Sequence, residues 1–439
     1  MAGQRLRLNA LVEQARASLF FIPMLAVIGA VAAGAIALAV DRHLDQQPGN
    51  LPLGLVTTVD GARALLSTIA GATITFAAIA FSVSLLIIQQ ASSQYSPRVV
   101  HTLFRDPFNK RVMGLVMGTF TFCLIVLRSV RSPREQGGEP IVPNVSVAIA
   151  VVLGISTILA IVAFINHSAH TMDVSEILER VRLEATEHIQ HTWRDPEPPH
   201  GRRPAAAAAA SVSGLAKIRF TRTGWIQQID FDAVIEAIAP GTTLRLDTGP
   251  GRYAIAGTVL ATVDPEPEDP DRLEEAVNEA ILIGATRTMQ QDAPYALRQL
   301  ADVAVKALSP GINDPTTAQD AIFHSAAVLA ELIRRDPPQP VVTERDGRHL
   351  VAAQQSTPAD LVQLAFAETR QAAVEHSAVC IYLLEAIELV VEPLVATGMT
   401  DRATPLLAQA ALVIDGCRAA DLLPGDLRDI EDAYRRRFD

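Results

Sequence analysis

The chain has 439 residues, of which 49% are hydrophobic and 19% are charged, and its mean hydropathy is +0.24. Soluble domains usually carry about a quarter charged residues, so this composition argues against a soluble enzyme. The charge is divided unevenly: residues 1–166 contain 12 Lys and Arg against 7 Asp and Glu, whereas residues 167–439 contain 25 against 41. Because phosphate binding requires a basic surface, the acidic second part argues against a nucleic-acid partner.

Four apolar stretches are long enough, or nearly so, to cross a bilayer, which takes about 20 residues. They lie at about 18–40, 65–88, 112–130 and 145–165. Each should be a helix, since lipid offers the backbone no hydrogen-bonding partner. We therefore predict a polytopic α-helical membrane protein with a transmembrane domain over residues 1–170.

The Lys and Arg residues near the span ends predict the orientation, because cytoplasmic flanks carry an excess of them. The N-terminus and the second loop together hold seven such residues, and the opposite side holds five. This bias places the N- and C-termini in the cytoplasm and predicts the bacterial inner membrane as the location.

The second span carries a polar residue every seven positions. The four are Thr68, Thr75, Ser82 and Gln89, and Gly71, Ala78 and Leu85 lie between them. Small and hydroxylated residues in one row favour close helix packing. The same row would also suit a pore lining in an oligomer. Both readings stay open at this stage, and the absence of ionisable residues well inside the spans argues against an ion-coupled transporter.

The end of the second span is rich in amides and hydroxyls. The stretch reads QQASSQYSPRVV, and it places Gln94, Tyr95 and Arg98 at the level of the lipid headgroups. A Tyr–Arg pair there is ordinary membrane anchoring. The concentration of polar groups exceeds what anchoring needs, so these three residues are also candidates for a gate or a ligand mouth.

Two pairs of histidines follow the fourth span, one just before and one near the end of a helix expected to leave the membrane over residues 171–194. His167 and His170 lie in the sequence FINHSAH, and His188 and His191 lie farther along. Histidine and carboxylate side chains three or four residues apart on a helix can bind a metal. The alternative is a solvated polar stripe, so these four are weak metal-ligand candidates.

The remaining residues predict a cytoplasmic α+β region. Residues 195–213 are rich in proline and alanine and read as a linker. Alternating apolar residues and regular glycines over residues 214–264 predict a small β-barrel-like module. Residues 271–439 are mainly helical in pattern, apart from a hairpin expected at residues 341–351.

Helix signals divide this last region. From Leu273 the apolar residues follow a helical period through Val277 and Ile281. Pro294 opens another predicted helix. Asp314, followed by Pro315, is a strong start signal for the next one, since Asp caps a helix and Pro suits its first position. Further helical stretches are expected over about 358–391, either as one helix or with a break, and over about 401–418.

Four motifs in order resemble one known family: QQASSQYSPRVV, FINHSAH, GWIQQID and YALRQLADVAVKALSPGINDPTTA. Over nearly its whole length the chain is similar to the bacterial membrane proteins grouped as domain of unknown function 2254. The resemblance implies N-terminal transmembrane helices and a large soluble C-terminal region. It implies no activity, substrate, cofactor or catalytic residue.

The INDPTTA turn in the last motif is a ligand-binding candidate. Asn313, Asp314, Thr316 and Thr317 gather at a helix N-terminus, where backbone amides and the helix dipole favour an anion. The alternative is a capped turn that fixes two helices.

The sequence therefore favours an oligomeric, channel-like or gated pore with a cytoplasmic sensing domain. The alternative is a membrane-anchored ligand-binding or scaffold protein without transport activity. No catalytic motif is found, so neither an enzyme nor a cofactor is expected. The expected partners are the lipid bilayer, further copies of the chain and a small-molecule or ion ligand.

Overall fold

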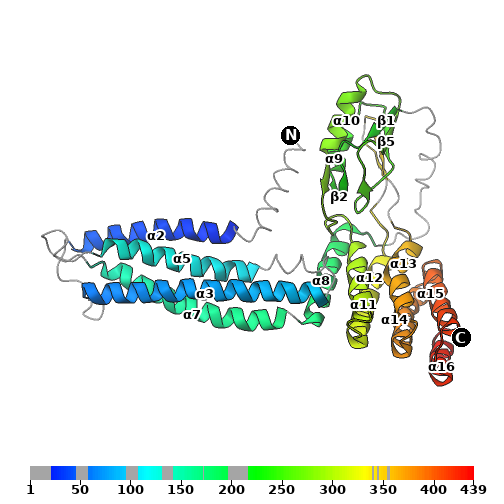
Figure 1. Cartoon of the computed structure of the whole chain (residues 1–439). Coiled ribbons are helices and arrows are strands. Elements are labelled where there is room, and N and C mark those ends of the chain that lie inside the picture. Colours follow the sequence, from blue (N-terminus) through cyan, green and yellow to red (C-terminus); the bar gives the residue numbers. More distant parts are fainter. Residues whose placement is uncertain are drawn as a thin grey trace. The chain divides into compact units, whose positions relative to one another are not determined.

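The computed structural model describes residues 21–45, 58–94, 107–130, 142–171, 173–195, 216–338, 341–343, 346–352 and 356–439. The chain forms two compact units (Figure 1). We call the unit of Leu11–Ser93 and Pro97–Asp173 the membrane unit, and the unit that contains Val174–Asp439 the second unit.

The membrane unit is a bundle of long helices (Figure 1). The helices are α2 (Phe21–Asp45), α3 (Val59–Gln94), α5 (Pro107–Ser129) and α7 (Asn144–Thr171). Each contains a stretch long and apolar enough to cross a membrane, and each of the four predicted spans falls on one of them. The described residues therefore contain four candidate membrane helices, as the sequence predicted.

Small residues let these helices approach closely. Gly114 and Gly118 on α5 lie against Ala26 on α2, so a Cβ added at Gly114 would be 3.2 Å from the Ala26 Cβ. Gly34 on α2 faces Ile125 on α5 in the same way. A glycine allows the backbone of the neighbouring helix to approach closely. Since lipid tails are as apolar as the side chains, the hydrophobic effect does not drive helices together in a membrane, and the van der Waals contacts of this close packing stabilise the bundle instead.

Polar groups also join the helices. The Thr119 hydroxyl on α5 and the Thr157 hydroxyl on α7 are buried and hydrogen-bonded at 3.1 Å. At the end of α2 the buried Asp41 carboxylate accepts hydrogen bonds from the backbone N–H groups of Val145 (2.8 Å) and Ser146 (3.0 Å). The Ser146 hydroxyl donates a third bond, at 2.5 Å. Asp41 therefore caps the N-terminus of α7 from another helix.

The second unit contains two small sheets. The strands are β1 (Ala216–Arg219), β2 (Gly224–Ile229), β3 (Thr243–Leu246), β4 (Tyr253–Ala254), β5 (Val259–Asp264), β6 (Ile281–Gly284), β7 (Val341–Thr343) and β8 (His349–Val351). One sheet has the order β1-β5-β3-β8-β7 and the other β4-β2-β6. The described strands form no closed barrel, so the barrel-like detail of the prediction is not confirmed.

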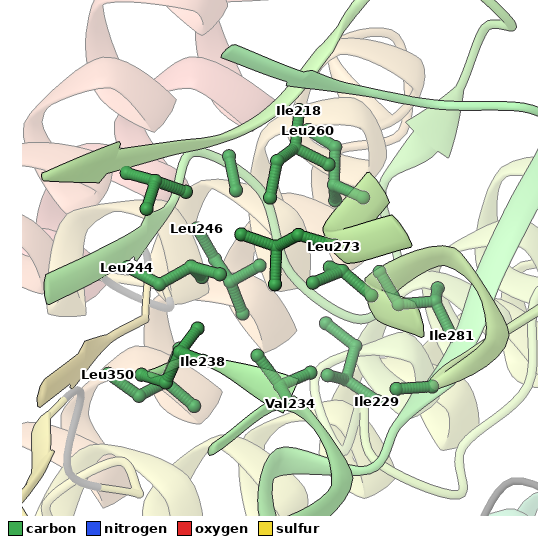
Figure 2. Packing of buried hydrophobic residues seen from close by; sticks show 14 of the residues in the cluster. Ile218, Ile229, Val234, Ile238, Leu244, Leu246, Leu260, Leu273, Ile281 and Leu350 are labelled. Carbon is green, nitrogen blue, oxygen red and sulfur yellow. The ribbon is translucent and has the colours of Figure 1, made fainter. Parts of the chain in front are cut away.

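Two short helices complete this β region, α9 (Phe231–Ala237) and α10 (Pro270–Glu279). Apolar side chains from both sheets and both helices form one core, as Figure 2 shows for Ile218, Leu246 and Leu273. Leu350 joins this core because β8 pairs in parallel with β3. The predicted hairpin at 341–351 is thus present, and it extends a sheet that began more than a hundred residues earlier.

One predicted helical stretch is a strand. The apolar pattern from Leu273 predicted that Ile281 continues the helix, but α10 ends at Glu279 and β6 begins at Ile281. β6 pairs antiparallel with β2 from Ile281 with Ile229 to Gly284 with Trp225. A run of four apolar residues fits either period, so pairing with β2 decided the outcome.

The rest of the second unit is helical. The helices are α8 (Val174–Thr192), α11 (Tyr295–Ala307), α12 (Pro315–Arg334), α13 (Pro358–Ala373), α14 (Ser377–Ala396), α15 (Thr400–Ala419) and α16 (Pro424–Phe438). They pack in two rows: α8, α12, α14 and α16 form one, and α11, α13 and α15 form the other. The predicted helix starts at Pro294 and Asp314 are confirmed within a residue. α16 was not predicted.

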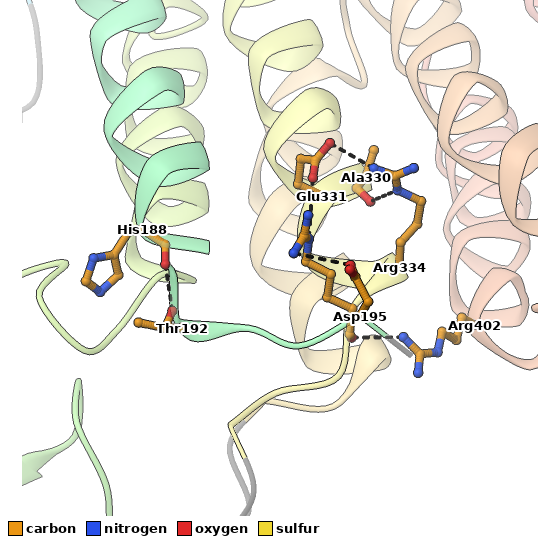
Figure 3. A network of polar contacts seen from close by, with 8 residues as sticks. His188, Thr192, Asp195, Ala330, Glu331, Arg334 and Arg402 are labelled. Atoms are coloured by element: carbon orange, nitrogen blue, oxygen red, sulfur yellow. Dashed lines mark hydrogen bonds and ion pairs between the residues drawn. The ribbon is translucent and has the colours of Figure 1, made fainter. Parts of the chain in front are cut away.

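Arg402 on α15 closes the end of α12 (Figure 3). Its guanidinium donates to the backbone carbonyls of Ile333 and Arg335, both at 2.9 Å, and forms an ion pair with Asp336. The backbone of Asp336 in turn pairs with that of Arg194, which follows α8. The last carbonyls of a helix lack hydrogen-bond partners within that helix. Arg402 supplies donors to the carbonyls at the end of α12, and through Asp336 it links α15 and α12 to the residue that follows α8.

Candidate functional site

α3 has two chemically different faces. Its inward face buries one threonine, Thr73, among mostly small apolar side chains, which are Ala62, Leu66, Ala70, Ala77 and Ala80. The predicted pore-lining residues Thr68, Thr75, Ser82 and Gln89 are exposed. At 100° per residue these four lie on the side opposite the buried set. We call Thr68, Gly71, Thr75, Ala78 and Ser82 the outward stripe.

The hydroxyls of the outward stripe are already satisfied. Thr68 donates to the carbonyl of Ala64 at 2.7 Å, and Thr75 donates to that of Gly71 at 2.8 Å. Ser82 donates to the carbonyl of Ala78 at 2.9 Å. A hydroxyl that bonds to the carbonyl four residues earlier can face lipid without a large penalty, and its oxygen keeps a free lone pair for a further contact.

The outward stripe does not pack against the chain's other described helices. A Cβ added at Gly71 would have no neighbour within 4 Å, whereas Gly34, Gly114, Gly118 and Gly154 each face another helix closely. Gly29 on α2 is also open, but its face includes the exposed Leu25 and Ile36. The small residues of the outward stripe therefore have no partner among the described helices.

The other outward faces of the bundle are large and aliphatic. α7 exposes seven of its aliphatic side chains, which are Ile149, Val152, Ile155, Ile158, Leu159, Val162 and Ile165. Such a surface suits lipid tails. The outward stripe differs from it in size and polarity, although exposed Ile79 and Leu86 flank it on α3.

Little of the predicted membrane interface belongs to the described residues. Gln94 is the last residue of α3, and its side chain lies outside the described set. Tyr95 and Arg98 also lie outside the described residues. Their role as a gate or ligand mouth stays a prediction.

The INDPTTA turn is a capped turn whose polar groups bond to one another. The Asp314 carboxylate accepts from the backbone N–H of Thr317 at 3.1 Å and from its hydroxyl at 2.6 Å. These hydrogen bonds from Thr317 hold the pKa of Asp314 below its usual value. Asn313 adopts a left-handed backbone with φ of 50°, which asparagine tolerates. Asn313 and Thr316 are exposed, and binding of a ligand here stays a prediction.

The first histidine pair lies at the end of α7. The His167 ring contacts the Phe108 ring of α5, with centroids 4.6 Å apart. The side chain of His170 is outside the described set. Among the residues that the structure describes, no three His, Cys, Asp or Glu side chains gather as a metal site.

The second histidine pair lies at the end of α8. His191 is exposed, whereas His188 is half-buried and its Nε2 atom is buried with no hydrogen-bond partner among the described residues. Burial lowers the pKa of His188, a hydrogen bond with the backbone of Gln290 opposes this, and the neighbouring His191 lowers it further. The arrangement disfavours a charged His188.

We expect His188 to make the second unit sensitive to acid. In the unfolded chain its pKa is roughly 6.5, and in the folded chain it is lower, so the folded state binds fewer protons in that window. The stability that neutral His188 contributes above about pH 6.5 should be lost as the pH falls below it. The measurement is the melting temperature of the full chain in detergent between about pH 7.5 and pH 5.5. His188→Gln should melt with a clearly shallower pH dependence than the wild type, whereas His191→Gln should reduce the dependence only in part, because it removes one cause of the lowered pKa and leaves the burial of His188 in place; equal slopes for all three would contradict the assignment.

Sequence reasoning missed a buried ion pair beside His188. Asp292, which is 6% exposed, pairs with Arg287, whose guanidinium lies 4.9 Å from the centroid of the Tyr295 ring. Burial raises the pKa of Asp292, although Arg287 partly offsets this. Gly251, with φ of 80°, brings the β3–β4 turn directly against this carboxylate. The ATRTMQQDAP stretch that holds Arg287 and Asp292 has no periodic pattern that would predict the ion pair. The one signal in the sequence is Gly251, which indicates a turn but not the contact of that turn with Asp292.

The comparisons with known proteins agree with the membrane unit. A family model described as "Predicted membrane protein (DUF2254)" matches residues 16–388. An uncharacterized protein of Mycobacterium bovis and two of Mycobacterium tuberculosis strains are each 30% identical over 366 residues, which is 81% of this chain and 68% of the relative. No solved structure matches the chain. The chain therefore belongs to the DUF2254 family of membrane proteins.

Proposed function

We propose that this member of the DUF2254 family assembles from several copies in the bacterial inner membrane, with the outward stripes of α3 facing one another around a pore. The observation that carries the proposal is the position of the stripe, opposite the face of α3 that packs in the bundle. Both termini are proposed to be cytoplasmic, from the excess of basic residues on that side.

Two properties of the stripe support an assembly. Its glycine, alanine and hydroxyl side chains are small, so helices from neighbouring copies can approach closely there. The same residue types are in contact wherever they occur on the inward faces, as at Gly114 and Gly118. None of the described helices lies within 4 Å of a Cβ added at Gly71, so the α3 helix of a second copy has room to approach it.

Two further properties support a pore. The three hydroxyls recur every seven residues, so they form a column of polar oxygens along the helix. Gln89 continues the column toward the end of the helix and is exposed. Hydroxyl oxygens of this kind can replace part of the water around a small permeating solute. The second unit would then bias the open or closed state, with the Asn313–Thr317 turn as its proposed ligand site.

The first test is ion flux from liposomes that contain the purified full chain. We expect flux in the wild type, and we expect Ser82→Trp to reduce it at least tenfold, because an indole in each copy would fill the column. Val152→Trp is the matched control, since Val152 is 62% exposed on α7, away from the stripe, and should leave flux unchanged.

Cross-linking separates assembly from conduction. Thr75→Cys should give covalently linked copies with a short thiol cross-linker, and Val152→Cys should not. Links at Thr75 without flux at any voltage, tension or pH would support the membrane-anchored scaffold or ligand-binding function instead. If neither cross-links nor flux are found, the outward stripe is not the functional site.

A further inference from the structure

The second unit contains two cysteines that are distant in sequence and adjacent in space. Cys380 lies on α14 and Cys417 on α15, and their Sγ atoms are 3.4 Å apart. The two helices pack side by side, and both thiols are buried, at 2% and 0% exposure.

A chain of hydrogen bonds holds the sulfurs in place. The Cys417 thiol donates to the Sγ atom of Cys380, and the Cys380 thiol donates to the carbonyl oxygen of Ala373 at 3.2 Å. Ala373 is the last residue of α13, so three helices fix the pair. A disulfide bond is roughly 2.05 Å long, and the two sulfurs would therefore have to approach by only about 1.4 Å.

We infer that Cys380 and Cys417 form a reversible disulfide that covalently joins α14 to α15 when the protein meets a peroxide. The geometry that supports this is the direct contact of the two sulfurs, with no side chain between them. When Cys417 ionises, the Cys380 thiol can donate its hydrogen bond to the Cys417 sulfur instead; this hydrogen bond lowers the pKa of Cys417 and makes Cys417 the first nucleophile.

The chemistry balances with hydrogen peroxide as the oxidant. The Cys417 thiolate attacks one peroxide oxygen, the O–O bond breaks, and the departing hydroxide takes up a proton to become water, which leaves a sulfenic acid on Cys417. Cys380 then loses its proton and attacks that sulfur; the S–O bond breaks and a second water leaves. Two thiols are oxidised by two electrons in total, and one peroxide is reduced to two waters.

Burial sets the rate and the specificity of this reaction. Peroxide reaches the sulfurs through local opening between α14 and α15, so oxidation should be slower than at an exposed thiol. The resolving thiol is already in contact with the attacking one, which favours the disulfide over further oxidation to a sulfinic acid. The bond would join residues 37 positions apart and restrict the relative motion of the two helices.

The chain provides its own control thiol. Cys123 is buried on α5 in the membrane unit, and no other described cysteine contacts it. Under the same treatment it should stay a thiol, so a general oxidation of buried cysteines would be visible at Cys123.

The experiment uses the full chain in detergent or nanodiscs. The reduced protein is treated with hydrogen peroxide, denatured, alkylated and digested, and its peptides are identified by mass spectrometry. We expect a disulfide-linked pair of peptides carrying Cys380 and Cys417, an alkylated Cys123, and recovery of both thiols with dithiothreitol. Oxidation should also raise the melting temperature of the wild type by several degrees, and dithiothreitol should reverse the increase.

Variants make the assignment specific. Cys123→Ala should behave as the wild type, whereas Cys380→Ala and Cys417→Ala should show no peroxide-dependent rise in melting temperature. The wild-type peptide measurement needs no variant, so it decides the matter if an alanine variant fails to fold. Full alkylation of Cys380 and Cys417 after peroxide, or sulfinic acid at either without the linked peptides, would overturn the inference.

Discussion

Replacing Gly251 with alanine is expected to lower the free energy of unfolding of the second unit by about 4 kcal/mol or more. Gly251 has a backbone φ of 80°, which costs an L side chain roughly 1–2 kcal/mol. The added Cβ would also overlap the Asp292 carboxylate. Asp292 is buried and paired with Arg287, so moving it breaks a buried ion pair and leaves both charges short of partners.

A matched glycine separates the two causes. Gly257 has nearly the same φ, 86°, but a Cβ added there would have no neighbour within 4 Å. Gly257→Ala should therefore cost only the backbone strain, about 1–2 kcal/mol. The measurement is chemical or thermal unfolding of the full chain in detergent, followed through the second unit. Equal losses for the two variants would show that the contact with Asp292 contributes nothing.

Replacing Asp41 with alanine is expected to destabilise the membrane unit by about 2–4 kcal/mol. The carboxylate accepts hydrogen bonds from Val145 N–H, Ser146 N–H and the Ser146 hydroxyl, and Asp41 and Ser146 are both buried. Without it these donors at the start of α7 lose their partner where water has little access. The negative charge also interacts favourably with the N-terminal end of the helix dipole.

Asp41→Asn should destabilise the membrane unit less than Asp41→Ala does, because the amide oxygen of asparagine still accepts hydrogen bonds, although it carries no charge. Asp60 is the control. It lies in the first turn of α3, is exposed, and no hydrogen bond or ion pair to a described residue is found for it, so Asp60→Ala should cost less than about 1 kcal/mol. The measurement is the melting temperature of each variant in the same detergent. An Asp41→Ala variant that melts with Asp60→Ala would show that the cap is not stabilising.

The predictions that held depended on local or periodic signals. Asp314 followed by Pro315 starts a helix because the cap and the fixed φ act within one turn. The hairpin at 341–351 is present, and Gly347 in its connection takes a positive φ of 79°, which suits a glycine. The prediction that Ile281 continues a helix was wrong because a run of four apolar residues satisfies both a helical and a strand period. Pro424 carried a start signal for α16 that was not used.

Only part of the candidate site could be predicted from the sequence. The seven-residue repeat of Thr68, Thr75 and Ser82 shows from the sequence that they share one helix face. It does not show whether that face turns toward the bundle or away from it. The structure turns it outward, because the larger contribution to packing comes from Leu66 and its alanine neighbours on the other side.

By itself, the amino-acid sequence predicted a membrane protein with four apolar helices long enough to cross a bilayer, followed by an acidic, mainly helical region. Apolar length and helical period are sufficient for that, since lipid forces each backbone to satisfy its own hydrogen bonds. Only the tertiary structure decided that Asp41 caps a helix that begins about a hundred residues later. It also decided that Cys380 meets Cys417 and that Asp292 lies against Gly251. These contacts join residues far apart in the chain, and they form where packing of whole elements, rather than local preference, sets the distance between side chains.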